Sequence, residues 1–132
     1  MRYLIDTDWV VYYLRGHQKI VDKVRTYQSD GLAISVITLA ELQAGVYYSS
    51  DPEHARQGLN DFLSVVKILL INEEICDYYG QEYARLRKEG QVIGGFDLLI
   101  ATTCLYHNFT LLTNNIKHFE RISGLKIESL SG

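Results

Sequence analysis

The fold is set first by the stretch RYLIDTD, residues 2–8, in which a short apolar run ends in polar residues. Continuous apolar runs of this length are typical of strands that are buried on both faces of a sheet. We therefore expect a strand over residues 2–7, with Asp6 and Asp8 at its carboxyl end. Taken alone, each of these acids is equally well explained as a turn residue after a strand.

Further apolar runs alternate with helical patterns along the rest of the chain. Runs typical of strands lie at residues 32–37, 65–71, 110–113 and 125–130. Apolar residues at helical spacing predict helices over residues 20–29, 39–46, 52–63, 73–90 and 97–105. This alternation predicts an α/β fold with a mostly parallel central sheet flanked by helices. In such sheets, ligands bind outside the carboxyl ends of the strands.

Length and composition limit the classes of protein to consider. The 132 residues, of which 47% are hydrophobic and 22% charged, predict a single domain over residues 1–132. No apolar run approaches the ~20 residues that cross a bilayer, and no signal-peptide pattern is present, so we expect a cytoplasmic protein without membrane contact. We expect both cysteines, Cys76 and Cys104, to be buried in the core. The net charge of −3 gives no general attraction to nucleic acid, so any such contact must be local.

Three acids and a following pair of asparagines fall near the carboxyl edge of the predicted sheet. Asp6 ends the first strand, Glu41 lies in the helix after the second, and Asp97 begins the central helix. Asn114 and Asn115 follow the strand at 110–113. Carboxylates gathered in this way repel one another unless a cation lies between them, and Mg²⁺ prefers oxygen ligands. A metal-activated water hydrolyses phosphodiesters without a Ser, Cys or His nucleophile.

Each acid also has an alternative explanation. Asp97 suits an N-cap, and Glu41 suits the far half of a capping box that begins at Thr38. Asp6 and Asp8, which are separated by one residue, also fit a phosphatase of the haloacid dehalogenase type, with Asp6 as nucleophile. A binding module without catalytic activity, in which the acids serve as helix caps, is the third possibility.

Four stretches, in this order, resemble the VapC toxins, which are PIN-domain ribonucleases of toxin–antitoxin systems. They are YLIDTD at 3–8, ISVITLAEL at 34–42, GGFDLLIA at 94–101 and LLTNN at 111–115, the last continuing through FERI at 119–122. The resemblance implies a PIN-like three-layer fold and an endoribonuclease dependent on Mg²⁺ or Mn²⁺. It also implies a VapB-like antitoxin as a partner and a homodimer.

The resemblance assigns roles to individual residues by position. It implies that Asp6, Glu41 and Asp97 hold the metal and that Asn115 is a fourth catalytic side chain. Supporting roles fall to the neighbours of these residues, namely Thr7, Asp8, Thr113 and Asn114. Two positions depart from the family, because Asp8 stands where Asn is frequent and His118 stands where an acid is frequent.

Two groups of surface residues suggest partners. Lys117, His118 and Arg121 lie just beyond the predicted site and are candidate RNA contacts. We interpret His118 chiefly as a partly exposed helix residue. A second cationic group near the N-terminus is interpreted as ordinary surface and comprises Arg15, Lys19, Lys23 and Arg25. The adjacent tyrosine pairs 12–13 and 47–48 suggest protein interfaces, whereas Tyr79 and Tyr83 suit the core.

Overall fold

The computed structural model describes residues 2–130, and its strands form one parallel sheet. The strand order is β3-β2-β1-β4-β5, which places β1 in the centre. Tyr3 of β1 lies opposite Leu32 of β2 on one side and Thr110 of β4 on the other. The strands are β1 Tyr3–Ile5, β2 Leu32–Ser35, β3 Lys67–Leu69, β4 Thr110–Leu112 and β5 Lys126–Glu128.

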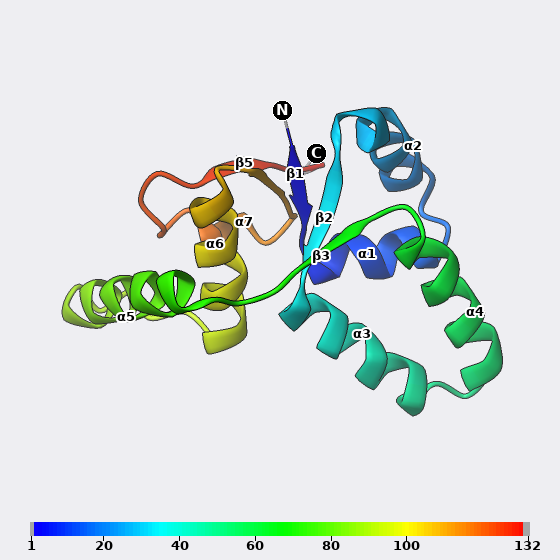
Figure 1. Cartoon of the computed structure of the whole chain (residues 1–132), viewed down its shortest axis with the longest axis horizontal. Coiled ribbons are helices and arrows are strands. Elements are labelled where there is room, and N and C mark those ends of the chain that lie inside the picture. The colour runs from blue at the N-terminus through cyan, green and yellow to red at the C-terminus, as the bar shows by residue number, and fades with distance from the viewer. Residues whose placement is uncertain (1, 131–132) are drawn as a thin grey trace.

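Helices cover both faces of this sheet and complete three layers. In Figure 1, α1, α2 and α4 lie on one side of β1 and β2, and α5, α6 and α7 lie on the other. The helices are α1 Thr7–Leu14, α2 Gln18–Tyr27, α3 Val36–Tyr48, α4 Pro52–Leu63, α5 Glu73–Lys88, α6 Gly95–His107 and α7 Ile116–Phe119, with a 3-10 turn η1 at Gln28–Asp30. Within residues 2–130, every helix is too short or too polar to cross a membrane.

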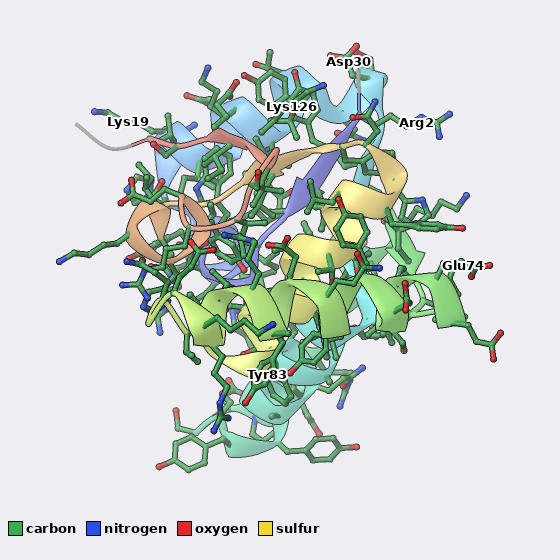
Figure 2. All side chains as sticks on the ribbon, turned by 90° about the vertical axis from the view of Figure 1, so that its left-hand side faces the viewer. Arg2, Lys19, Asp30, Glu74, Tyr83 and Lys126 are labelled. Atoms are coloured by element: carbon green, nitrogen blue, oxygen red, sulfur yellow. The ribbon has the colours of Figure 1, made fainter. Side chains whose placement is uncertain are left out.

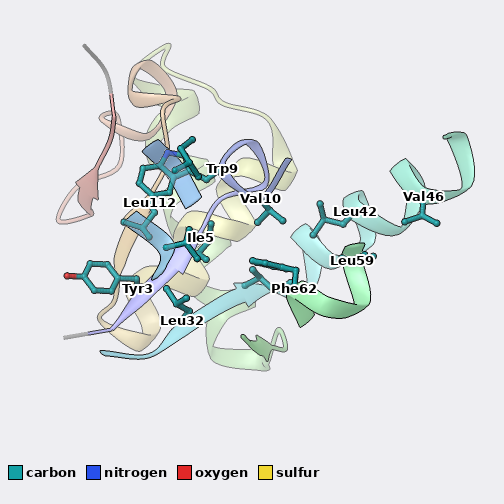
Figure 3. Close-up of a cluster of buried hydrophobic side chains, with 13 residues drawn as sticks. Tyr3, Ile5, Trp9, Val10, Leu32, Leu42, Val46, Leu59, Phe62 and Leu112 are labelled. Atoms are coloured by element: carbon teal, nitrogen blue, oxygen red, sulfur yellow. The ribbon is translucent and has the colours of Figure 1, made fainter. Parts of the chain in front are cut away.

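One hydrophobic cluster lies on each face of the sheet. Figure 3 shows the first, in which Trp9 and Val10 of α1 pack near Ile5 and Leu112, and Phe62 of α4 joins them. The second cluster includes Leu4 and Leu111 of the same strands together with much of α6. Successive residues of β1 therefore point to opposite clusters, as buried strands require. Burial of a side chain such as Phe62 contributes about 1.5–3 kcal/mol to folding.

The α/β fold with a parallel sheet is as predicted, and most predicted elements are present. The strands are shorter than expected, since β1 ends at Ile5 and β2 at Ser35. Asp51 caps α4 as predicted, because its side chain accepts a hydrogen bond from the His54 backbone N–H. Cys104 is buried, but Cys76 is exposed on α5, so the expectation that both cysteines are buried is wrong for Cys76.

Three local predictions at the carboxyl edge are wrong. Residues Thr7–Leu14 form a helix, α1, where we expected the first strand to extend to residue 7 and predicted no helix. The side chain of Ser35 caps α3, so Thr38 lies inside that helix and does not form a capping box with Glu41. Asp97 is likewise the third residue of α6, whose N-cap is Gly94, and is not itself the cap. The Asp6 side chain accepts from the backbone N–H of Thr7 and caps α1.

Candidate active site

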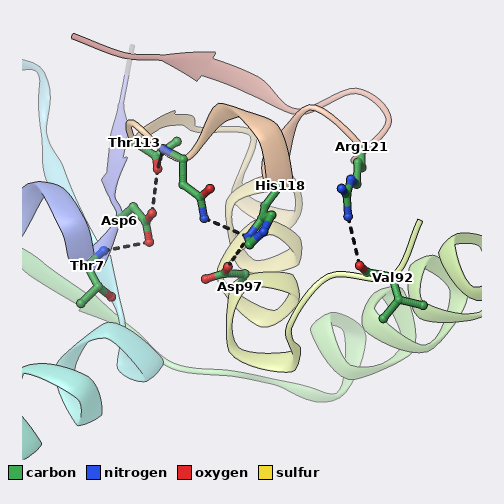
Figure 4. Close-up of polar contacts among 8 residues, drawn as sticks. Asp6, Thr7, Val92, Asp97, Thr113, His118 and Arg121 are labelled. Carbon is green, nitrogen blue, oxygen red and sulfur yellow. Dashed lines mark hydrogen bonds and ion pairs between the residues drawn. The ribbon is translucent and has the colours of Figure 1, made fainter. Parts of the chain in front are cut away.

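Asp6 is the buried centre of the polar residues at the carboxyl edge, with 4% of its surface exposed. The Thr7 backbone N–H donates to Asp6 Oδ1 at 2.8 Å, and the Thr113 hydroxyl donates to Asp6 Oδ2 at 2.7 Å (Figure 4). Burial and, after it, the Asp8 charge raise the pKa of Asp6 to about 7, although the two hydrogen bonds oppose the rise. The carboxylate is therefore held in a fixed orientation in which its negative charge is poorly solvated.

Asp8 is a second, partly buried carboxylate on the first turn of α1. Its Oδ1 accepts from the Trp9 backbone N–H at 2.7 Å, and its Oδ2 accepts from the Asn114 backbone N–H at 3.1 Å. Burial raises the pKa of Asp8, and the Asp97 charge adds to this. The charge of Asp8 raises the pKa of Asp6 more than the charge of Asp97 does. Sequence reasoning placed Asp8 beside Asp6 at the end of the first strand and gave it a supporting role in the nuclease.

Glu41 joins the site through hydroxyl groups. The Thr7 hydroxyl donates to Glu41 Oε1 at 2.7 Å, and its oxygen lies 3.0 Å from the Thr38 hydroxyl. Thr38 is fully buried on α3, one turn before Glu41. The resemblance implied that Thr7 positions the site, and the contact with Glu41 agrees with that role. The contribution of Thr38 was missed, because its spacing to Glu41 matched a capping box.

Asp97 lies against α7. Its Oδ2 is 3.2 Å from His118 Nδ1, and Asn115 Nδ2 is 3.0 Å from the same nitrogen (Figure 4). The Asn115 backbone N–H also donates to the Thr113 hydroxyl at 3.0 Å, which links α7 to the Asp6 carboxylate. The side chain of His118 is 45% exposed, as expected for a partly exposed helix residue, yet it contacts an acid of the site.

The remaining predicted residues are divided between structural contacts and open surface. The Asn114 side-chain oxygen accepts from Trp9 Nε1 at 3.0 Å and from the Leu130 backbone N–H at 2.9 Å. Arg121 Nη1 donates to the Val92 carbonyl at 3.1 Å, which ties the residues after α7 to the loop before α6. Lys117 is exposed. In the second cationic group, the Lys23 ammonium lies 3.9 Å from Glu128, which agrees with ordinary surface.

The chemistry of these side chains fits a hard divalent cation. Asp6, Asp8 and Asp97 supply only oxygen donors, and each of the other two charges raises the pKa of Asp6. A cation would relieve both this repulsion and the poor solvation of the buried carboxylate. Within residues 2–130, however, no three Asp, Glu, His or Cys side chains lie close enough together to hold a metal ion as they stand.

Comparison with known proteins gives concordant matches over nearly the whole chain. The family pattern of the PIN domain matches residues 3–125. The chain is 38% identical over 131 residues to Ribonuclease VapC2 of Rickettsia felis, covering 98% of each chain. It is 36% identical over 128 residues to Ribonuclease VapC1 of Haemophilus influenzae strain R2866, covering 96% of each. The crystal structure of VapBC2 from Rickettsia felis bound to a promoter DNA fragment has a chain with a TM-score of 0.93 and 37% identity, covering 99% of this chain and 100% of that one.

Proposed function

The chain belongs to the VapC ribonucleases of the PIN-domain family, and from that premise we propose that it is a metal-dependent endoribonuclease and the toxin of a toxin–antitoxin module. The observation that carries this proposal is the buried carboxylate of Asp6, with Asp8 and Asp97 close enough to oppose its ionisation. The family favours a nuclease over the phosphatase and binding-module alternatives. The substrate is RNA, and residues 1–132 act as a single cytoplasmic nuclease domain.

Asp6, Glu41 and Asp97 would hold Mg²⁺ or Mn²⁺, with Asn115 as the fourth side chain of the site. When bound, such an ion activates a water molecule and neutralises charge on the phosphate oxygens. The hydrogen bond from Thr113 fixes the carboxylate plane of Asp6. Buried carboxylates that are oriented in advance need no reorganisation when the substrate arrives.

The neighbouring residues hold the other two ligands in place. The Thr7 hydroxyl orients Glu41, and His118 with Asn115 orients Asp97. Asp8 adds negative charge beside Asp6, which strengthens attraction for a cation and disfavours an unoccupied site. These contacts predict that the acids act as a unit, so removal of either Asp6 or Asp97 should abolish cleavage.

The test compares wild type, Asp6→Asn and Asp97→Asn on total cellular RNA with Mg²⁺, Mn²⁺ or EDTA, and maps the new RNA ends. Asp61→Asn serves as the matched control, because Asp61 is an exposed residue of α4. We expect cleavage by wild type and by the control only when metal is present. Cleavage that persists in EDTA, or in both site variants, would contradict the mechanism. Absence of cleavage by folded wild type with either metal would contradict the proposed activity.

We assign the antitoxin to the groove between α1, α3 and α4. This groove has a volume of about 370 Å³ and is lined mainly by apolar residues, including Leu14, Val46 and Leu59. Arg15 and His54 lie at the same groove and offer contacts to an acidic segment. An amphipathic helix of a VapB-like antitoxin fits such a surface. The structural relative from Rickettsia felis is itself a VapBC complex.

We assign homodimerisation to the exposed face of α3. Tyr47 and Tyr48 at its end are 79% and 94% exposed, and Ala40 and Ala44 on earlier turns are also exposed. Tyrosines beside small apolar residues are typical of protein interfaces. A variant with Tyr47→Ala and Tyr48→Ala should elute as a monomer. Unchanged oligomeric state and unchanged antitoxin affinity would contradict this assignment of the tyrosine pair.

A further inference from the structure

An aromatic side chain stands exposed immediately beside the acid site. Phe96 lies in the first turn of α6, directly before Asp97, and 58% of its surface is exposed. It belongs to neither of the two hydrophobic clusters, whereas Leu98 and Ile100 of the same helix are buried in the second cluster. Single exposed apolar side chains are common on protein surfaces, so the significance of Phe96 lies in its position directly before Asp97.

The surface beside Phe96 is open. A Cβ atom built on Gly94 would meet no atom within 4 Å. Val92, two residues earlier in the same loop, is 50% exposed. Gly95, by contrast, faces the Tyr79 hydroxyl at 3.5 Å from such a Cβ position, so the crowded side of this turn is the side toward α5. Figure 2 shows α5 running across the near face of the molecule, with Tyr83 at its lower side.

The charges near the site do not by themselves explain how a polyanion would bind. The guanidinium of Arg121 is engaged by the Val92 carbonyl, and that of Arg85 by Glu82 at 2.7 Å and Glu89 at 2.9 Å. The chain as a whole carries a net charge of −3. Lys117 is exposed beside the site and can attract phosphate, and a contact that does not depend on phosphate charge would add to its contribution. Stacking of a base on an aromatic ring supplies about 1–3 kcal/mol and works with every base.

We propose that Phe96 is a stacking platform for a nucleobase next to the phosphodiester bond that is cleaved. The inference rests on the proposed ribonuclease activity and deepens it. Phe96 directly precedes Asp97, and consecutive Cα atoms are about 3.8 Å apart. The ring is therefore attached to the backbone next to the proposed metal ligand. Bases in a duplex are stacked on one another and do not offer a free face, whereas bases in single strands, loops and bulges do.

The test uses a short RNA that contains the mapped cleavage site, with an abasic nucleotide placed in turn at each position flanking the cleaved bond. For wild type, we expect one of these replacements to lower kcat/KM by about 5- to 150-fold, the equivalent of one stacked base. Phe96→Ala should lose a similar factor on intact RNA and almost nothing further on the abasic RNA. Phe96→Trp should retain both the activity and the sensitivity to the abasic position.

Tyr106→Ala is the matched control, because Tyr106 is an aromatic residue of the same helix, 42% exposed and one residue from its other end. It should behave as wild type on both RNAs. A thermal melt checks that each variant is folded.

Three results would overturn the proposal. The first is a loss of kcat/KM on the abasic RNA that is the same in wild type and in Phe96→Ala, which would mean that the ring contacts no base. The second is an unchanged kcat/KM in Phe96→Ala; an altered oligomeric state or antitoxin affinity of this variant would then assign the ring to a protein interface. If wild type cleaves no RNA, the proposed function fails, and stacking is then decided by RNA affinity alone: equal affinities of wild type and Phe96→Ala would refute it.

Discussion

Replacement of Asp6 by Asn should stabilise the folded protein at pH 8 and have little effect at pH 4. The pKa of Asp6 is raised from an ordinary value of 3.8 to about 7, mainly by burial and then by the Asp8 charge. The folded state thus binds this proton more tightly than the unfolded state does. The stability that the neutral carboxyl contributes is fully present below pH 3.8 and is lost as the pH rises through about 7.

The size of the effect follows from the same difference in pKa. The interval from 3.8 to about 7 corresponds to about 4 kcal/mol of unfolding free energy that wild type lacks at pH 8. An Asn side chain keeps an oxygen for the Thr7 N–H, and its amide N–H can donate to the Thr113 hydroxyl oxygen, which donates to Asp6 in wild type. Allowing about 1 kcal/mol for altered hydrogen bonds, we expect a gain of about 2–4 kcal/mol.

The assay is urea unfolding of both proteins in EDTA at intervals from pH 4 to pH 8.5, with unfolding free energies compared at each pH. All other titrating groups are shared by the two proteins, and Asp8 is the one whose charge acts most strongly on Asp6, so the pH-dependent difference reports this pair of carboxylates. Asp61→Asn removes one exposed carboxylate and should stay parallel to wild type throughout. A difference between Asp6→Asn and wild type that is the same at pH 4 and pH 8 would refute the reasoning. A loss of stability at pH 8 would refute it more directly.

Substitutions at four further residues test individual contacts in and beside the site. Thr7→Val should cost about 1–2 kcal/mol in urea unfolding, because the Glu41 carboxylate loses its hydroxyl donor, whereas Thr7→Ser should not; equal stability of both would contradict the contact. His118→Ala should retain at least a tenth of the wild-type cleavage rate, because His118 only positions Asp97. A loss as severe as that in Asp97→Asn would contradict this role. Lys117→Glu should lower RNA affinity and reduce the slope of its salt dependence by about 0.7, with the melting temperature unchanged. Arg121→Glu should instead lower the melting temperature, because its guanidinium is engaged by a backbone carbonyl.

The sequence predicts the layers of this fold well, because parallel strands buried on both faces leave continuous apolar runs. The helix α1 was not predicted, since its eight residues, TDWVVYYL, are dominated by β-branched and aromatic types that favour strands. Burial of Trp9 and Val10 in the first cluster stabilises this helix through tertiary packing. Such packing is invisible to local patterns.

The acids of the site were predicted by position, but their contacts were not. Asp6 follows a strand and Asp97 lies at the start of a helix, and these positions place both acids at the carboxyl edge of the sheet independently of the loop conformations. The contact of Thr7 with Glu41 joins residues 34 positions apart, and no local spacing indicates it. The same holds for the contact between Asp97 and His118, which depends on where α7 packs.

The position of β4 beside β1 has a consequence for synthesis of the protein on the ribosome. One side of β1 has no neighbouring strand until Thr110–Leu112 has emerged, and the Thr113 hydroxyl reaches Asp6 only then. Asp97 also belongs to the part of the chain that is made late. Domains fold largely as units during translation. A nascent chain therefore carries no complete acid site until β4 has emerged, so the proposed RNA cleavage would begin only after that point in synthesis.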